Sequence, residues 1–398
     1  MKHKIWSDKD SVFYRKLFSL VLPIAFQQFM LAAVSASDAL MLGFVNQDSL
    51  SSVSLAGQIT FVFNLFMGGL TMGTSILAAQ YYGKGDMISI EKIFAYVIKV
   101  SFLISATFFL AALFIPKTLM CIFTNEPQLI ASGIVYLRVV SLSYLFTGIS
   151  QIYLCILKNT GCAVKSMVIG STAVIINIFL NTALIYGLMF FPEMGIAGAA
   201  LATSISKLIE MGWACMESLR EKRARLRIKY CFKTEKNLVQ DYWKYTMPML
   251  GDYLVWGCGF TTYSVIMGHL GSDAVAANSI ANIVKNLIVS FCTGLGNGGG
   301  IIVGNELGMG NLKQAKEYGS RLCKLAVISG VLSGVVLTAL IPVIVRVTAL
   351  SPQATGYLKW MLILCACYMV GKSINMTTIA GIFPAGGDSG FGLICDAV

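Results

Sequence analysis

A carboxylate lies inside a strongly apolar stretch near the start of the chain. Residues 22–43 read LPIAFQQFMLAAVSASDALMLG, a run of helical length with Gln27 one turn after Pro23 and Asp38 in its second half. An ionised carboxylate is costly in hydrocarbon unless it faces a partner or a wet cavity, so such residues mark ion pathways. We therefore predict that Asp38 binds a small cation or exchanges a proton. The alternative is a protonated or hydrogen-bonded structural aspartate.

Further polar side chains occur in two later apolar runs. Asn177 and Asn181 in INIFLNTALIYG are four residues apart, so they share one face of a helix. Thr203 lies in the next run, GIAGAALATSISK. A carboxylate, two amide oxygens and a hydroxyl form a plausible ligand set for a small cation. Helix–helix hydrogen bonding is the common alternative for each asparagine taken alone.

The second half of the chain has a different polar pattern. Asp252 follows Pro248 by four residues, where the first half has Gln27, and Lys285 and Lys372 lie inside apolar runs. An intramembrane lysine needs a partner or a wet cavity, and Asp252 could pair with either one. We predict that Gln27, Asp252, Lys285 and Lys372 line a substrate cavity.

The sequence carries no recognisable catalytic arrangement. Gly294, Gly296 and Gly299 satisfy G-x-G-x-x-G, but a dinucleotide-binding fingerprint needs a strand before it, and this one lies in an apolar run. GKGD at 83–86 lacks the spacing of a phosphate-binding loop. Neither Ser-His-Asp nor HExxH is found, so we expect no enzyme, no metal centre and no cofactor beyond a coupling ion.

Composition defines the class of protein. The 398 residues are 56% hydrophobic and 12% charged, with a mean hydropathy of +0.74. A soluble domain has about twice that charged fraction. Apolar runs of about 20 residues, the length that crosses a bilayer, recur along the chain. We predict an all-α polytopic membrane protein in contact with lipid and without nucleic acid, for which a monomer is the favoured state.

Ten membrane spans can be drawn, six in the first half and four in the second. They cover 17–43, 50–82, 93–115, 128–156, 166–190, 195–217, 243–268, 275–306, 320–345 and 354–383. We predict an N-terminal six-helix lobe at 1–217, a basic linker at 218–242 and a C-terminal lobe at 243–398. Basic residues gather in connectors on the side of the N-terminus, so this side is predicted to be cytoplasmic and the protein to lie in the plasma membrane. The linker is expected to be solvated and to face lipid headgroups.

Proline, glycine and aspartate residues of the first half recur in the second half at a constant offset. This repeat offset is the separation between Pro23 and Pro248. Further punctuating residues match at this repeat offset, namely Gly43 with Gly268, Asp48 with Asp273, Gly69 with Gly294, Gly73 with Gly298, Gly83 with Gly308, Gly85 with Gly310 and Pro127 with Pro352. We infer an internal duplication. Since six spans precede the second copy, both copies start from the same side and form parallel repeats. The duplication also predicts two further helices, of which GFGLICDAV reads as an opening, so a truncated chain is expected.

Taken together, several motifs resemble the multidrug and toxic compound extrusion (MATE) transporters, within a superfamily that includes lipid-linked oligosaccharide flippases. They are LPI with Asp38, GGLTMGTSILAAQYYGKGD at 68–86, ILKNTG at 156–161, NIFLNTALIYG, GIAGAALATSIS, GSDAVAANSIA at 271–281, IIVGNELGMGNLKQAK at 301–316 and AGIFPAGGDS at 380–389. The resemblance covers nearly the whole chain.

The resemblance implies two six-helix lobes around a V-shaped cavity, twelve helices in all, and export of organic, often cationic, compounds driven by sodium or proton entry. It implies coupling roles for Asp38, Asn177 and Thr203. Asn181 stands where many members have a second aspartate, which leaves the coupling ion open. The expected function is cation-coupled antiport of drugs or metabolites. The alternatives are a flippase for lipid-linked sugars, which the two lysines leave open, and a non-transporting remnant.

Overall fold

The computed structural model describes the backbone of residues 8–45, 47–188, 191–220, 224–232, 235–348 and 350–397. Within those helices, the side chains of 8–11, 36, 38–40, 42–45, 47–50, 228, 232, 265, 268, 272, 396 and 397 are outside the description. The described backbone is helical or forms turns and connectors, with no strand in these ranges.

Ten long helices occur within the described ranges, and each overlaps one predicted span. They are α1 (Asp8–Val45), α2 (Gln47–Lys84), α3 (Met87–Phe114), α5 (Pro127–Asn159), α6 (Ala163–Tyr186), α7 (Gly195–Ser218), α9 (Lys236–His269), α10 (Ser272–Gly308), α11 (Leu312–Val347) and α12 (Pro352–Thr377). The shorter elements are α4 (Pro116–Cys121), α8 (Ile228–Phe232), a π-helix at Thr378–Ile382, α13 (Phe383–Ala385) and α14 (Ser389–Ala397). The prediction of an all-α chain is confirmed.

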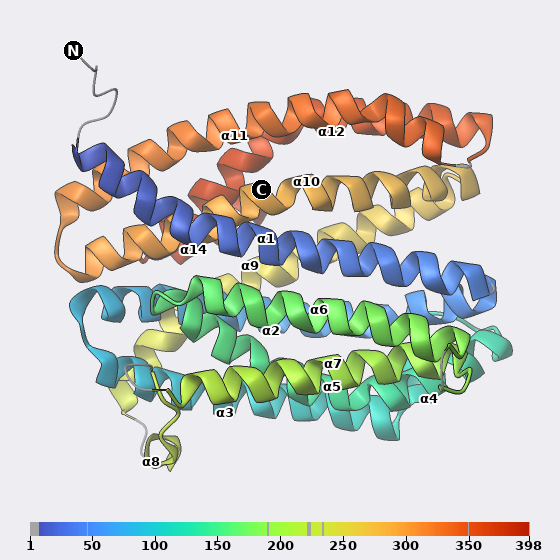
Figure 1. Ribbon diagram of the computed structural model, residues 1–398, viewed down its shortest axis with the longest axis horizontal. Helices are drawn as coiled ribbons and strands as arrows, with labels where there is room; N and C mark the ends of the chain where they lie inside the picture. Colours follow the sequence, from blue (N-terminus) through green and yellow to red (C-terminus); the bar gives the residue numbers. More distant parts are fainter. Residues whose placement is uncertain are drawn as a thin grey trace. The chain divides into compact units, whose positions relative to one another are not determined.

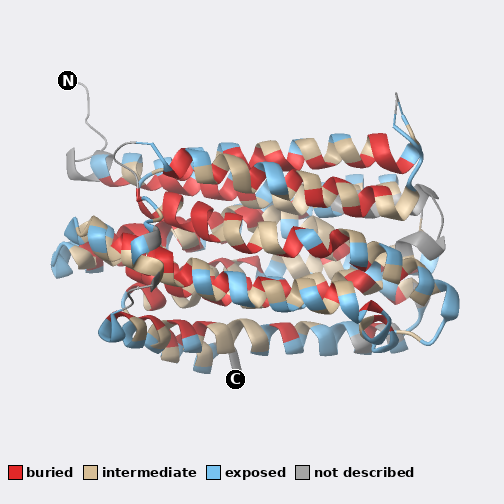
Figure 2. Ribbon diagram, turned by 90° about the horizontal axis from the view of Figure 1, so that it is seen from below, coloured by how far each residue is buried: buried red, intermediate tan, exposed pale blue. Residues whose placement is uncertain are grey.

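Eight of the helices are long and apolar enough to cross a membrane, judged on the described residues alone. The two predicted spans not among them, 195–217 and 243–268, correspond to α7 and α9. Both helices are long enough to cross a membrane. Lys207, Glu210 and Glu217 of α7, which lie among small residues, lower the hydropathy of that helix. Large apolar side chains such as Leu103, Val347 and Trp360 are exposed, which suits a surface that faces lipid. Buried and exposed residues alternate along the long helices (Figure 2).

One predicted boundary was wrong. The fifth span was expected to continue to residue 190, but α6 ends at Tyr186. Gly187 follows with φ of 65°, the left-handed conformation that closes many helices and that glycine adopts without steric cost.

The helices form two compact units. Unit 1 comprises Met1–Ala32, Ala79–Asp86 and Leu254–Val398, and unit 2 comprises Ala33–Ala78 and Met87–Tyr253, so α1, α2 and α9 each contribute to both. In unit 1, α10, α11 and α12 pack against one another, and in unit 2, α5 packs against α3, α6 and α7 (Figure 1). The lobe boundaries predicted from the sequence stay a prediction.

The internal duplication is visible in the helix contacts. At several glycines an added Cβ would lie within about 3 Å of an atom of another helix, and four of them illustrate the repeat. These contacts are Gly69 with Leu250 and Gly73 with Thr246 between α2 and α9 in unit 2, and Gly294 with Ala25 and Gly298 with Val21 between α10 and α1 in unit 1. The two pairs of contacts correspond under the repeat. Adding the repeat offset to Gly69 gives Gly294, and subtracting it from Leu250 gives Ala25, and Gly73 and Thr246 correspond to Gly298 and Val21 in the same way. The first helix of each repeat therefore packs on the second helix of the other repeat, in one register.

Turns repeat in the same way. Gly85 and Gly310, which follow α2 and α10, have φ of 78° and 79°. Pro127 and Pro352 begin α5 and α12, where the missing N–H of proline costs nothing. The duplication inferred from the sequence is confirmed by these matched conformations.

The π-helix lengthens the repeat offset by one residue. After Thr378–Ile382 the matching positions are Gly161 and Gly387, which both have positive φ, of 75° and 88°, and the helix starts Ala163 and Ser389 of α6 and α14. A π-helical turn holds one more residue than an α-helical turn. The extra residue is thus absorbed directly after α12, without disturbing the helix that follows.

Part of the basic linker docks on α3, while Arg225, Arg227 and Lys229 stay exposed, and contact of the linker with lipid headgroups stays a prediction. Glu91 of α3 is buried and accepts from the backbone N–H of Arg225 at 3.3 Å, and it pairs with Arg227 at 2.7 Å. Lys92 pairs with Glu235 at 2.6 Å. A buried carboxylate must have such partners, and the linker provides them.

Replacing Glu91 by alanine should therefore release the linker. We expect trypsin to cut after Arg225 or Arg227 about tenfold faster, because a hydrogen-bonded buried charge contributes about 1.5–3 kcal/mol and cleavage follows the open population. Glu235→Ala is the control, since Glu235 is 61% exposed and exposed ion pairs contribute little. Equal cleavage of both variants would contradict a role for Glu91 in docking the linker.

Candidate functional site

The polar face of α7 is the starting point of the site in unit 2. Thr203, Ser206, Lys207 and Glu210 follow one another at helical spacing, so they share one side of the helix. The rest of the first half of α7 consists mainly of glycine and alanine, which allows neighbouring helices to approach closely.

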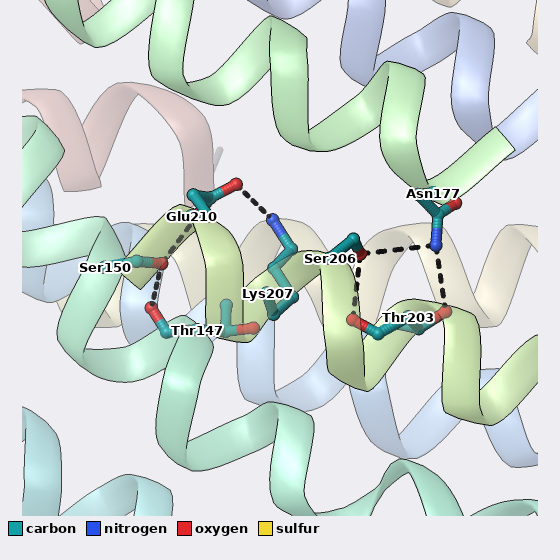
Figure 3. Close-up of polar contacts among 7 residues, drawn as sticks. All are labelled: Thr147, Ser150, Asn177, Thr203, Ser206, Lys207 and Glu210. Atoms are coloured by element: carbon teal, nitrogen blue, oxygen red, sulfur yellow. Dashed lines mark hydrogen bonds and ion pairs between the residues drawn. The ribbon is translucent and has the colours of Figure 1, made fainter. Parts of the chain in front are cut away.

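Asn177 of α6 is the centre of a buried amide–hydroxyl cluster. Its amide nitrogen lies 3.4 Å from the hydroxyl oxygens of both Thr203 and Ser206 (Figure 3). Asn181, one turn further along α6, donates to the side-chain oxygen of Asn177 at 3.2 Å. Only 6% of Asn177 and 1% of Asn181 is exposed. The predicted shared face of the asparagines and their proximity to Thr203 are confirmed, whereas their role in ion coupling stays a prediction.

A charged group next to this cluster was missed by the reasoning from sequence. Glu210 is 2% exposed, accepts from the Ser150 hydroxyl of α5 at 2.6 Å and pairs with Lys207 at 2.9 Å (Figure 3). Two opposite charges three residues apart inside an apolar helix were a usable signal. The contact with Ser150 was not, because it joins residues far apart in the sequence.

Asp38 lies within α1, but its side chain is outside the described residues. Met41, one helical turn later on α1, contacts α6. The hydroxyl of Tyr186 donates to the backbone oxygen of Met41 at 2.8 Å, and the Thr182 hydroxyl lies 3.9 Å from its sulfur. This part of α1 therefore packs beside the part of α6 that follows Asn181.

The four predicted cavity residues divide between the units. Asp252 belongs to unit 2, whereas Gln27, Lys285 and Lys372 belong to unit 1. Gln27 is buried, and the other three are half-buried. The pairing of Asp252 with a lysine and the cavity role of these residues stay predictions.

Lys285 ends a polar ladder along α10. Its ammonium donates to Asn282 at 2.6 Å, Asn282 donates to Asn278 at 3.2 Å, and the Tyr263 hydroxyl of α9 donates to Asn278 at 3.2 Å. The two asparagines were missed from the sequence, although their spacing of four residues places them on one helical face.

Comparisons with known proteins agree with this architecture. The MatE family model matches residues 23–183 and 248–397, so its two matches begin at Pro23 and Pro248, the prolines that define the repeat offset. The uncharacterized transporter YisQ of Bacillus subtilis is 23% identical over 372 residues, covering 93% of this chain and 81% of YisQ. A probable multidrug resistance protein NorM of Thermotoga maritima is 23% identical over 347 residues, covering 85% of this chain and 73% of that protein.

Two solved structures share the fold. A MOP superfamily transporter from Pyrococcus furiosus superposes with a TM-score of 0.87 at 18% identity, covering 97% of this chain and 85% of the other. An outward-facing multidrug resistance MATE family transporter gives a TM-score of 0.86, with the same identity and coverage.

The fold and the apolar helices thus define a multi-pass helical membrane protein of the transporter class. The chain belongs to the MatE family, whose model matches most of its length in two copies.

Proposed function

We propose that the chain is a cation-coupled antiporter that exports organic, cationic compounds by alternating access, with Na⁺ or H⁺ entering in exchange. The observation that carries this proposal is the buried cluster of Asn177, Asn181, Thr203 and Ser206 inside unit 2. Amide and hydroxyl oxygens are suitable ligands for a small hard cation. Buried polar groups within membrane helices commonly line ion pathways.

Asp38 is the proposed source of negative charge for the cluster. Successive spans cross the membrane in opposite directions, so α1 and α6, which are the first and fifth spans, run in the same direction. Because Met41 of α1 contacts Thr182 of α6, the residues one turn before each of them also lie at the same level. By this reasoning the backbone of Asp38 is at about the level of Asn177 and Asn181. Cation binding there would favour one arrangement of the helices over another, which is the requirement for ion-driven alternation.

The substrate class rests on the relatives. NorM of Thermotoga maritima is named as a probable multidrug resistance protein, and PmpM of Pseudomonas aeruginosa as a multidrug resistance protein. We extend export of organic compounds from them to this chain, in the plasma membrane with the N-terminus in the cytoplasm. Lys84, Lys158 and Lys165, which lie in or next to connectors assigned to the side of the N-terminus, support that orientation.

The proposal is tested by ethidium transport into inside-out membrane vesicles from cells that lack their own exporters. Vesicles carrying the chain should accumulate ethidium when a Na⁺ or pH gradient is imposed and lose it when an ionophore removes the gradient. Empty-vector vesicles are the control, and membrane insertion is checked by immunoblot of the membrane fraction. Well-inserted protein with no gradient-dependent accumulation of ethidium, or of a panel of other organic cations, would refute the proposal.

A further inference from the structure

An ion pair between a partly buried lysine and a buried carboxylate, next to the proposed coupling site, has no role so far. The ammonium of Lys207 lies 2.9 Å from one carboxylate oxygen of Glu210, and the Ser150 hydroxyl donates to the other at 2.6 Å. Both oxygens of Glu210 are therefore engaged, in a side chain of which 2% is exposed.

Lys207 is placed between this carboxylate and the amide–hydroxyl cluster. It follows Ser206 directly, and it lies one helical turn after Thr203 on the same face of α7. Figure 3 shows its ammonium end directed toward Glu210, while Asn177 reaches Thr203 and Ser206 from α6.

We propose that Glu210 is a positioning residue that sets the cation affinity of the cluster through Lys207. Glu210 holds the ammonium of Lys207 at its carboxylate and compensates the positive charge of that ammonium. It thereby keeps this positive charge away from the oxygens of Asn177 and Thr203. Without Glu210, Lys207 would stand uncompensated one turn from the cluster, and like charges repel strongly at that range in a medium of low dielectric constant. This inference rests on the proposed cation coupling and adds the residue pair that tunes it.

A double-mutant cycle in transport-competent vesicles tests the proposal. The variants are Glu210→Gln, Lys207→Gln and both together, and the readout is the Na⁺ or H⁺ concentration that gives half-maximal ethidium transport. We expect Glu210→Gln to raise this concentration at least tenfold. Lys207→Gln should leave it unchanged or lower it, because Glu210 keeps the Ser150 hydroxyl as a hydrogen-bond partner. The double variant should return to within about threefold of the wild type.

The matched control is Glu217→Gln on the same helix. Glu217 is equally buried and pairs with Arg220 at the same spacing, at 3.2 Å, but lies two turns further from the cluster. It should leave the cation dependence unchanged. Thermal stability of each purified variant separates a folding defect, which would affect Glu210→Gln and Glu217→Gln alike, from an electrostatic one.

Three outcomes would overturn the inference. The first is a Glu210→Gln variant with wild-type cation dependence, and the second is a double variant as impaired in cation dependence as Glu210→Gln. The third, which remains readable if Glu210→Gln does not fold, is a higher half-maximal concentration in Lys207→Gln. Wild-type transport without any cation dependence would instead refute the proposed coupling itself, so the two failures are distinguishable.

Discussion

Vesicles that carry the Asp38→Asn variant are expected to show no gradient-driven ethidium transport, a loss of at least tenfold relative to the wild type. Asparagine has nearly the same size as aspartate but lacks the negative charge. Without that charge, neither Na⁺ nor H⁺ gains enough differential binding energy to shift the protein between two conformations. The measurement is initial ethidium uptake at fixed protein content, under both an imposed Na⁺ gradient and an imposed pH gradient.

Two control variants are compared with Asp38→Asn. Asp241→Asn removes a carboxylate from an exposed position at the start of α9 and should transport as the wild type does. Asp38→Glu keeps the charge with one additional methylene and should retain part of the activity. Transport by Asp38→Asn at the wild-type rate, with the gradient dependence intact, would leave an exporter but exclude Asp38 as its ion-binding carboxylate.

Gly83→Ala and Gly308→Ala are expected to cause the largest losses of stability among conservative changes. A Cβ at Gly83 would meet the backbone oxygen of Asn305, and a Cβ at Gly308 would meet the backbone oxygen of Gln80. A carbonyl cannot move aside by changing rotamer, so α2 and α10 would have to separate. Overpacking of this kind costs about 1–3 kcal/mol. The measurement is the apparent melting temperature of the purified protein in detergent.

The control for both variants is Gly57→Ala on α2, where an added Cβ has no atom within 4 Å. It should be neutral or slightly stabilising, because alanine favours a helix over glycine. Since the contacts of Gly83 and Gly308 are counterparts under the repeat offset, the two losses should be similar. A Gly83→Ala or Gly308→Ala protein as stable as Gly57→Ala would contradict close approach of the helices.

Much of the fold could be predicted from local pattern. The apolar runs determine where the long helices lie, because a membrane helix satisfies its own backbone hydrogen bonds and needs only length and hydropathy. Gly69, Gly73, Gly83 and their counterparts revealed the duplication because glycine is required where helices approach closely. The lengthening of the repeat offset by one residue could not be predicted, since a π-helical turn has no distinct composition and depends on packing around Thr378–Ile382.

The site was predictable only in part. Helical periodicity placed Asn177 and Asn181 on one face, and the cost of polar groups in a membrane singled out Thr203 as a partner. The same argument selected Asp38 and Lys285, yet it passed over Glu210 and the docking of the linker on Glu91. Each of these two carboxylates has a partner that the sequence does not place near it: Ser150 donates a hydrogen bond to Glu210, and Arg227 pairs with Glu91.

The sequence by itself therefore determined the membrane class, the ten long helices, the repeat and the polar residues available for chemistry. These follow from composition, from short-range spacing and, for the repeat, from the constant offset between matching residues. The tertiary structure alone decided which of those residues meet. It joined the amide–hydroxyl cluster across α6 and α7, paired Glu210 with Ser150 of α5, and tied the linker to α3. The reason is physical: a buried charge or amide must find a partner, and which partner it finds depends on how the helices pack.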